Sequence, residues 1–233
     1  IKRFNEYIDF KTLEKWFYEL LHEYAKWASW ELKWHEKRNI SIKNIEFPFE
    51  YRPGKNTLVK GVYQTILRKK RLYIEAPTGV GKTISTIFPA VKAMGELFYL
   101  TAKTITRTVA QDAFNILSDN GVHLKYVTIT AKEKICILDK PTCNPGSCPR
   151  ALGHFDRVND AVFDVITHEE HITREIVSTY AEKHNVCPFE MCLDISTWVD
   201  AVIGDYNYAF DPNACLKRFF GTDTTSNNYI FLI

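Results

Sequence analysis

A glycine-rich stretch ending in Lys-Thr lies directly behind a short apolar run and has the spacing of a phosphate-binding loop. Residues 76–83, APTGVGKT, match a Walker A loop with alanine in the place of its first glycine. The glycines allow the backbone N–H groups and the following helix N-terminus to face phosphates. Lysine reaches the β and γ oxygens, and the threonine hydroxyl binds Mg²⁺. The residues expected to bind ATP and Mg²⁺ are Thr78, Gly79, Val80, Gly81, Lys82 and Thr83.

Cysteines form the second group that could do chemistry. Four of the six, Cys136, Cys143, Cys148 and Cys187, are separated by six, four and thirty-eight residues. Thiolates favour zinc or iron–sulfur clusters, and this spacing alone does not choose between them. Cys192 lies close enough to Cys187 to compete for the fourth position, although cysteine also serves as a small buried hydrophobe. Cys215 is expected to be a buried thiol.

The elements that position these residues alternate between helices and strands. The pattern predicts an amphipathic helix with an aromatic stripe over 12–39, which we expect to pack into a core. After a Pro- and Gly-containing loop at 47–56, helices are predicted at 62–69, 81–95 and 104–117, and strands at 72–76, 97–101 and 125–130. Such alternation is typical of an α/β fold with a parallel sheet.

The alternation stops between residues 132 and 197, where no strand is predicted. Helical patterns appear there at 158–166 and 172–184, and strand signals return in DAVIGDY, residues 200–206, and in the final YIFLI. The middle segment is therefore predicted to be a mainly helical insertion in the α/β domain. Its apolar positions are few, so we expect metal or cluster ligation to supply folding free energy.

Composition sets limits on the protein class. Hydrophobic residues make up 45% of the 233 residues, which is enough for a core, and 30 Lys plus Arg nearly balance 28 Asp plus Glu. Nucleic-acid binding would therefore depend on a local basic patch rather than on bulk charge. No long apolar span or signal-like segment occurs, so we expect a cytoplasmic protein without membrane contact.

The phosphate loop, with FPFEYRPGKN upstream and FYLTAKTITRTVAQ downstream, resembles the XPD/DinG-type superfamily 2 DNA helicases. The resemblance implies a RecA-like domain that binds ATP and single-stranded DNA and moves 5′→3′. It implies that Arg52 lies near the adenine, and that Thr101, Thr104 and Arg107 lie near DNA phosphates. Lys55 departs from the pattern, because relatives commonly have glutamine there, which puts adenine selectivity in question.

The same resemblance implies a 4Fe–4S cluster in the insertion. Members of the family carry a four-cysteine iron–sulfur domain at this place, and the motif Cys187-Pro188-Phe189-Glu190 matches the family's last ligand. The expected ligands are Cys136, Cys143, Cys148 and Cys187, with Cys192 as second choice for the fourth. Two alternatives stay open: a nucleic-acid-binding module with a vestigial phosphate loop, and a zinc-stabilised scaffold.

These expectations give four segments. They are an amino-terminal helical segment at 1–46, the first part of the helicase domain at 47–131, the iron–sulfur insertion at 132–197, and a return to the helicase domain at 198–233. In the family the final YIFLI would be followed by Asp-Glu-Ala-His, so no catalytic residue is expected within the chain. The 233 residues alone are expected to be monomeric and inactive in ATP hydrolysis.

Overall fold

The computed structural model describes residues 7–50, 54–77, 81–220 and 229–233. The chain divides into two compact units, Ile1–Lys37 and Arg38–Ile233. Helix α1, Phe10–Asn44, confirms the predicted first helix and supplies the described secondary structure of the first unit. No second element among that unit's described residues covers the aromatic stripe, and Trp16, Leu20 and Tyr24 are exposed. The core position expected for the stripe is therefore not seen within this unit.

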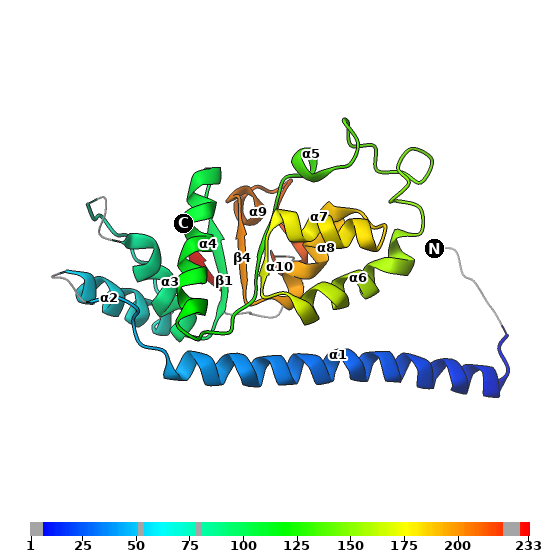
Figure 1. Ribbon diagram of the computed structural model, residues 1–233, viewed down its shortest axis with the longest axis horizontal. Helices are drawn as coiled ribbons and strands as arrows, with labels where there is room; N and C mark the ends of the chain where they lie inside the picture. Colours follow the sequence, from blue (N-terminus) through cyan, green and yellow to red (C-terminus); the bar gives the residue numbers. More distant parts are fainter. Residues whose placement is uncertain (1–6, 51–53, 78–80, 221–228) are drawn as a thin grey trace. The chain divides into compact units, whose positions relative to one another are not determined.

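Five parallel strands form one sheet in the second unit, in the order β3-β2-β4-β1-β5 (Figure 1). Leu97 of β1 pairs with Ala201 of β4 on one side and with Ile230 of β5 on the other. Every residue of β4 is buried, as expected for a strand inside a parallel sheet. The strands are β1 (Glu96–Leu100), β2 (Tyr126–Thr128), β3 (His171–Ile172), β4 (Ala201–Gly204) and β5 (Tyr229–Leu232). The predicted α/β class with a parallel sheet is confirmed.

Helices connect the strands, because parallel neighbours cannot be joined by a tight turn. The predicted helices at 81–95 and 104–117 correspond to α3 and α4, and the one at 62–69 corresponds to the longer α2. The helices of this unit are α2 (Lys55–Leu67), α3 (Lys82–Lys92), α4 (Thr104–Asp119), α5 (Lys132–Ile135), α6 (His154–His168), α7 (Arg174–Lys183), α8 (Pro188–Ile195), α9 (Asn207–Phe210) and α10 (Lys217–Phe220), with a 3-10 turn at Ser196–Trp198.

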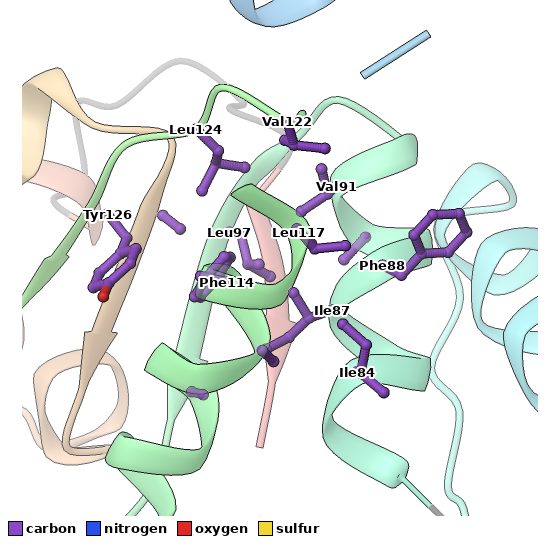
Figure 2. Packing of buried hydrophobic residues seen from close by; sticks show 14 of the residues in the cluster. Ile84, Ile87, Phe88, Val91, Leu97, Phe114, Leu117, Val122, Leu124 and Tyr126 are labelled. Atoms are coloured by element: carbon purple, nitrogen blue, oxygen red, sulfur yellow. The ribbon is translucent and has the colours of Figure 1, made fainter. Parts of the chain in front are cut away.

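The main core fixes α3 and α4 against the sheet. Figure 2 shows Ile87 of α3, Leu97 of β1 and Phe114 and Leu117 of α4 lying together, all almost completely buried. Truncating a buried side chain of this size typically costs about 2–5 kcal/mol. This packing holds the first turns of both helices in place beside the ends of the strands, where the predicted site residues lie.

The strand predicted at 72–76 is wrong. Residues 70–77 are described but form neither helix nor strand, and Leu72, Tyr73 and Ile74 are exposed. An apolar run becomes a strand only where a neighbouring strand supplies partners for its N–H and C=O groups. The sheet of the described residues supplies none here, so the segment leads into the phosphate loop as irregular chain.

The insertion has its own apolar core, contrary to the expectation from composition. Helices α6, α7 and α8 contact one another (Figure 1). Their buried side chains are Val158, Ala161, Val162, Val165, Ile166, Val177, Ala181, Met191, Cys192 and Ile195. The prediction of no strand in the insertion is also wrong at two residues, because β3 pairs with β2. The segment 136–153, which contains three cysteines, has no helix or strand and is mostly exposed.

Candidate nucleotide, DNA and cluster sites

The end of the phosphate loop is held by a glycine and by the first turn of α3. Gly81 has φ of 74°, a left-handed conformation that glycine adopts without steric cost, and α3 begins at the next residue. The Lys82 side chain is exposed, and its Nζ donates to the carbonyl oxygen of Ala76 at 2.7 Å. This bond closes the loop across its two ends. Thr78, Gly79 and Val80 lie outside the described residues, as does Arg52.

Thr83 links α3 to the sheet. Its side chain lies close enough to the hydroxyl of Tyr99 on β1 to affect the pKa of that group. Burial raises the pKa of the Tyr99 hydroxyl, while Thr83 acts in the opposite direction. The threonine expected to bind Mg²⁺ is half-buried.

Lys55, the first residue of α2, lies next to the phosphate loop. Its Nζ lies over the rings of Phe47 and Phe49, 5.0 and 4.9 Å from their centroids. The two rings, with Phe88 of α3 and the carboxylates of Glu46 and Glu50, line an open pocket with a volume of about 550 Å³. The loop upstream of α2 and helix α3 thus share one region of the surface.

The residues expected to contact DNA follow β1. Thr101 comes directly after the strand, where its N–H donates to the carbonyl of Gly204, and its Oγ1 accepts from the N–H of Lys103. Thr104 is the first residue of α4. One turn further on, Arg107 is only 18% exposed, and its Nη2 lies 3.4 Å from Oδ2 of Asp205, which follows β4. The Arg107 guanidinium is therefore engaged by a carboxylate that the sequence did not indicate.

Among the cysteines, Cys143 and Cys187 share a neighbour in Lys132. The Lys132 Nζ lies 3.8 Å from the Cys143 Sγ and 3.3 Å from Oε1 of Glu190. Burial acts to lower the pKa of Lys132, but Glu190 and, to a smaller extent, Cys143 and Cys187 raise it above its usual value. Cys136 accepts from the N–H of Leu138 through its Sγ. The described residues include no group of three His, Cys, Asp or Glu side chains placed to hold a metal ion. The structure thus associates two of the four predicted ligands and does not gather the full set.

Cys192, the second choice for the fourth ligand, is more deeply buried than Cys187. It is 1% exposed, and its Sγ donates to the carbonyl oxygen of Thr128 at the end of β2. Burial raises the pKa of this thiol to about 12, so the thiolate form that binds metals is strongly disfavoured. Burial also raises the pKa of Cys187, which is half-buried at the start of α8. Cys215 is also half-buried.

Two polar residues near these cysteines were missed by sequence reasoning. Lys132 lies four residues before Cys136, and its closeness in sequence to a predicted cluster ligand could have marked it as part of the site. His154 is 5% exposed, and its Nδ1 accepts from the N–H of Cys187 at 3.3 Å. Its Nε2 is buried and has no hydrogen-bond partner among the described residues, and burial lowers the pKa of the ring. Nothing in the sequence marks His154, because its partner is thirty-three residues away.

None of the described helices is both long enough and apolar enough to cross a bilayer.

Comparison with known proteins finds a relative by sequence and solved structures of related fold. No protein-family model matches the chain. The chain is 21% identical, over 247 aligned positions, to a regulator of telomere elongation helicase 1 homolog from Arabidopsis thaliana, covering 83% of this chain and 23% of the relative. A solved XPD helicase structure superposes with a TM-score of 0.55 at 14% identity, covering 78% of this chain and 32% of that one.

The chain spans less than a quarter of the length of its curated relative. The structural likeness concerns the fold, including the parallel sheet and its helices. The chain is thus similar in sequence to part of a helicase homolog and in fold to an XPD helicase.

Proposed function

We propose that this chain is part of the first motor domain of an ATP-dependent DNA helicase, with an iron–sulfur domain inserted in it. The observation that carries the proposal is the position of Lys82 and Thr83 in the first turn of α3, directly after a left-handed glycine. Ligands of open parallel α/β sheets bind beyond the carboxyl ends of the strands, which is where helices such as α3 and α4 begin.

ATP binding would use Lys82, whose ammonium donates to a carbonyl of the phosphate loop in this structure. Lys82 exchanges its bond to the Ala76 carbonyl for the β and γ phosphate oxygens, gaining a charge-assisted hydrogen bond. The Thr83 hydroxyl would hold Mg²⁺, whose charge offsets that of the phosphates. Arg52 would lie on the adenine side.

DNA binding would use the residues after β1. Thr101, Thr104 and Arg107 offer hydroxyls and a guanidinium, the groups that contact phosphates without reading sequence. Arg107 can bind a phosphate only by giving up Asp205 or by sharing its remaining N–H groups. Single-stranded DNA as partner, and a 5′→3′ direction in the complete protein, belong to this proposal.

The iron–sulfur part of the proposal rests on the donor set. Four cysteines within one insertion fit a 4Fe–4S cluster chemically, because its irons are held by four thiolates. Cys136, Cys143, Cys148 and Cys187 would hold it, and the cluster would supply cross-links between segment 136–153 and α8. The burial of Cys192 supports Cys187 as the fourth ligand. Lys132 would lower the cost of placing negative thiolates together.

Calorimetric titration with ATP and Mg²⁺, combined with fluorescence anisotropy on labelled single-stranded DNA, tests the proposal. The helicase proposal requires that ATP binding depends on Lys82 and that DNA binding weakens with added salt. DNA binding without ATP binding would instead favour a nucleic-acid-binding module with a vestigial loop. Zinc in place of iron and sulfide in anaerobically purified protein would favour the zinc-stabilised scaffold.

A further inference from the structure

The ammonium of Lys55 lies at the phosphate loop itself. A Cβ placed on Gly81 would lie 3.6 Å from the Lys55 Nζ and 3.7 Å from its Cε. Gly81 immediately precedes Lys82 and the first turn of α3. Lys55, which precedes Lys82 by 27 positions in the sequence, therefore places its ammonium beside the glycine that leads into Lys82.

The Lys55 ammonium is contacted by aromatic rings and not by a carboxylate of the described residues. The two phenylalanine faces attract the ammonium, since each ring carries negative charge density on its face. Among the residues that the structure describes, no carboxylate lies within ion-pair distance of the Lys55 Nζ. Aromatic faces occupy space around an ammonium but do not replace an anionic hydrogen-bond acceptor. The Lys55 Nζ thus keeps hydrogen-bonding capacity for an anion at the loop.

A polyphosphate is the ligand that fits such a pair of cations. The start of α3 directs unpaired backbone N–H groups and the positive end of the helix dipole toward the same place. Lys82 alone supplies one point charge, whereas the triphosphate of a nucleotide carries several. A second ammonium near Gly81 lowers the electrostatic cost of bringing those charges together.

We propose that Lys55 is a second phosphate-binding cation of the loop, acting beside Lys82 on the polyphosphate chain rather than on the base. This inference rests on the proposed ATP site. It assigns to Lys55 a role different from adenine selection, which the sequence resemblance put in question. It also predicts that binding retains a Lys55-dependent part when Lys82 is removed.

Base-free tripolyphosphate separates a phosphate role from a base role. We would titrate wild type, Lys55→Gln, Lys55→Arg and Lys82→Ala with ATP and with inorganic tripolyphosphate by calorimetry. Lys55→Gln should raise both dissociation constants by at least about tenfold, the scale of one lost charged hydrogen bond. Lys55→Arg should restore most of the affinity for both ligands, because it keeps the charge and the contact with the rings. Lys60→Gln, an exposed charge change on the same helix, should leave both constants unchanged.

Each other outcome overturns the inference in a distinct way. If Lys55→Gln weakens ATP but not tripolyphosphate, Lys55 acts on the nucleoside. If it weakens neither while Lys82→Ala weakens both, the proposed ATP site stands and Lys55 has no part in it. If wild type and Lys82→Ala bind ATP equally, the proposed ATP site fails, and the assignment of Lys55 fails with it.

Discussion

The ammonium of Lys82 donates to the carbonyl oxygen of Ala76 across the phosphate loop, with 2.7 Å between Nζ and oxygen. The same Nζ is the group proposed to bind the nucleotide phosphates, so this side chain would exchange one hydrogen-bond acceptor for another when the nucleotide binds. Because the Lys82 side chain is exposed, exchanging a neutral carbonyl for an anionic oxygen requires no opening of the core. This relationship leads to the first prediction.

Lys82→Ala should weaken ATP binding by about 1.5–3 kcal/mol, the contribution of a hydrogen bond to a charged group. The same substitution should change the free energy of unfolding by no more than about 0.5 kcal/mol, because the Lys82 side chain lies at the surface. Calorimetry and urea unfolding measure the two quantities. A matched change at Lys60, exposed on α2, controls for the loss of one positive charge. Equal ATP affinities of wild type and Lys82→Ala would sink the proposed nucleotide site.

Cys148→Ser should remove iron and sulfide from anaerobically purified protein and expose segment 136–153 to protease. Helices α6 to α8 should remain resistant, because they bury an apolar core of their own. Segment 136–153 lacks helices and strands, so its order would depend on ligation. Metal analysis and mass spectrometry of limited digests provide the measurements. Cleavage within α6 to α8 at the same rate as within 136–153 would contradict this division.

Cys192→Ala should leave iron content unchanged and lower the free energy of unfolding by about 1 kcal/mol, a typical effect of a small change in a core. The reason is that the Cys192 thiol is buried among apolar side chains and donates to a backbone carbonyl. Cys187→Ala is the matched comparison and should abolish iron binding. Loss of iron from Cys192→Ala with retention in Cys187→Ala would reverse the assignment of the fourth ligand.

The phosphate loop and the helices after it were predictable because their signals are local. Glycine and lysine spacing identified the loop, and helical periodicity identified α3 and α4. The irregular conformation of 72–76 was not predictable in the same way, since strand formation depends on a pairing neighbour elsewhere in the chain. The two residues of β3 are too few for a periodic pattern, and they pair only because β2 lies beside them.

Contacts across long sequence separations account for the rest of the site. The pair of Arg107 with Asp205 joins residues that are 98 positions apart, and the contact of Lys55 with Gly81 depends on how α2 packs against α3. Sequence spacing could nominate Arg107 and Lys55 as charged residues near a loop. It could not show that the Asp205 carboxylate pairs with Arg107, or that two phenylalanine rings contact the ammonium of Lys55.

The pair of Arg38 and Asp200 should make a large contribution to stability. Asp200 is 7% exposed; its carboxylate accepts from the Arg38 guanidinium and also from the N–H of Lys125. Asp200→Ala should lower the free energy of unfolding by about 3–5 kcal/mol, because it leaves a mostly buried guanidinium without its carboxylate. Urea unfolding measures the loss. A change below about 1 kcal/mol would show that water replaces the carboxylate at no cost.

Acid should destabilise the second unit partly through His171. Burial lowers the pKa of this imidazole below its usual value near 6.5, and the ring stacks on Tyr126 with 4.9 Å between centroids. Below pH 6.5 the unfolded chain takes up a proton that the folded protein does not, until the lowered folded pKa is reached. Stability attributable to His171 is therefore complete above pH 6.5 and is lost as the pH falls toward the folded pKa.

His171→Phe keeps an aromatic ring on Tyr126 but cannot titrate. The free energy of unfolding of this variant, measured in urea, should fall less than that of wild type between pH 7.5 and pH 5.5. The reason is that the protonation of the His171 imidazole no longer contributes to the pH dependence. If wild type and His171→Phe lose the same free energy over this interval, the buried imidazole is not a source of the acid sensitivity.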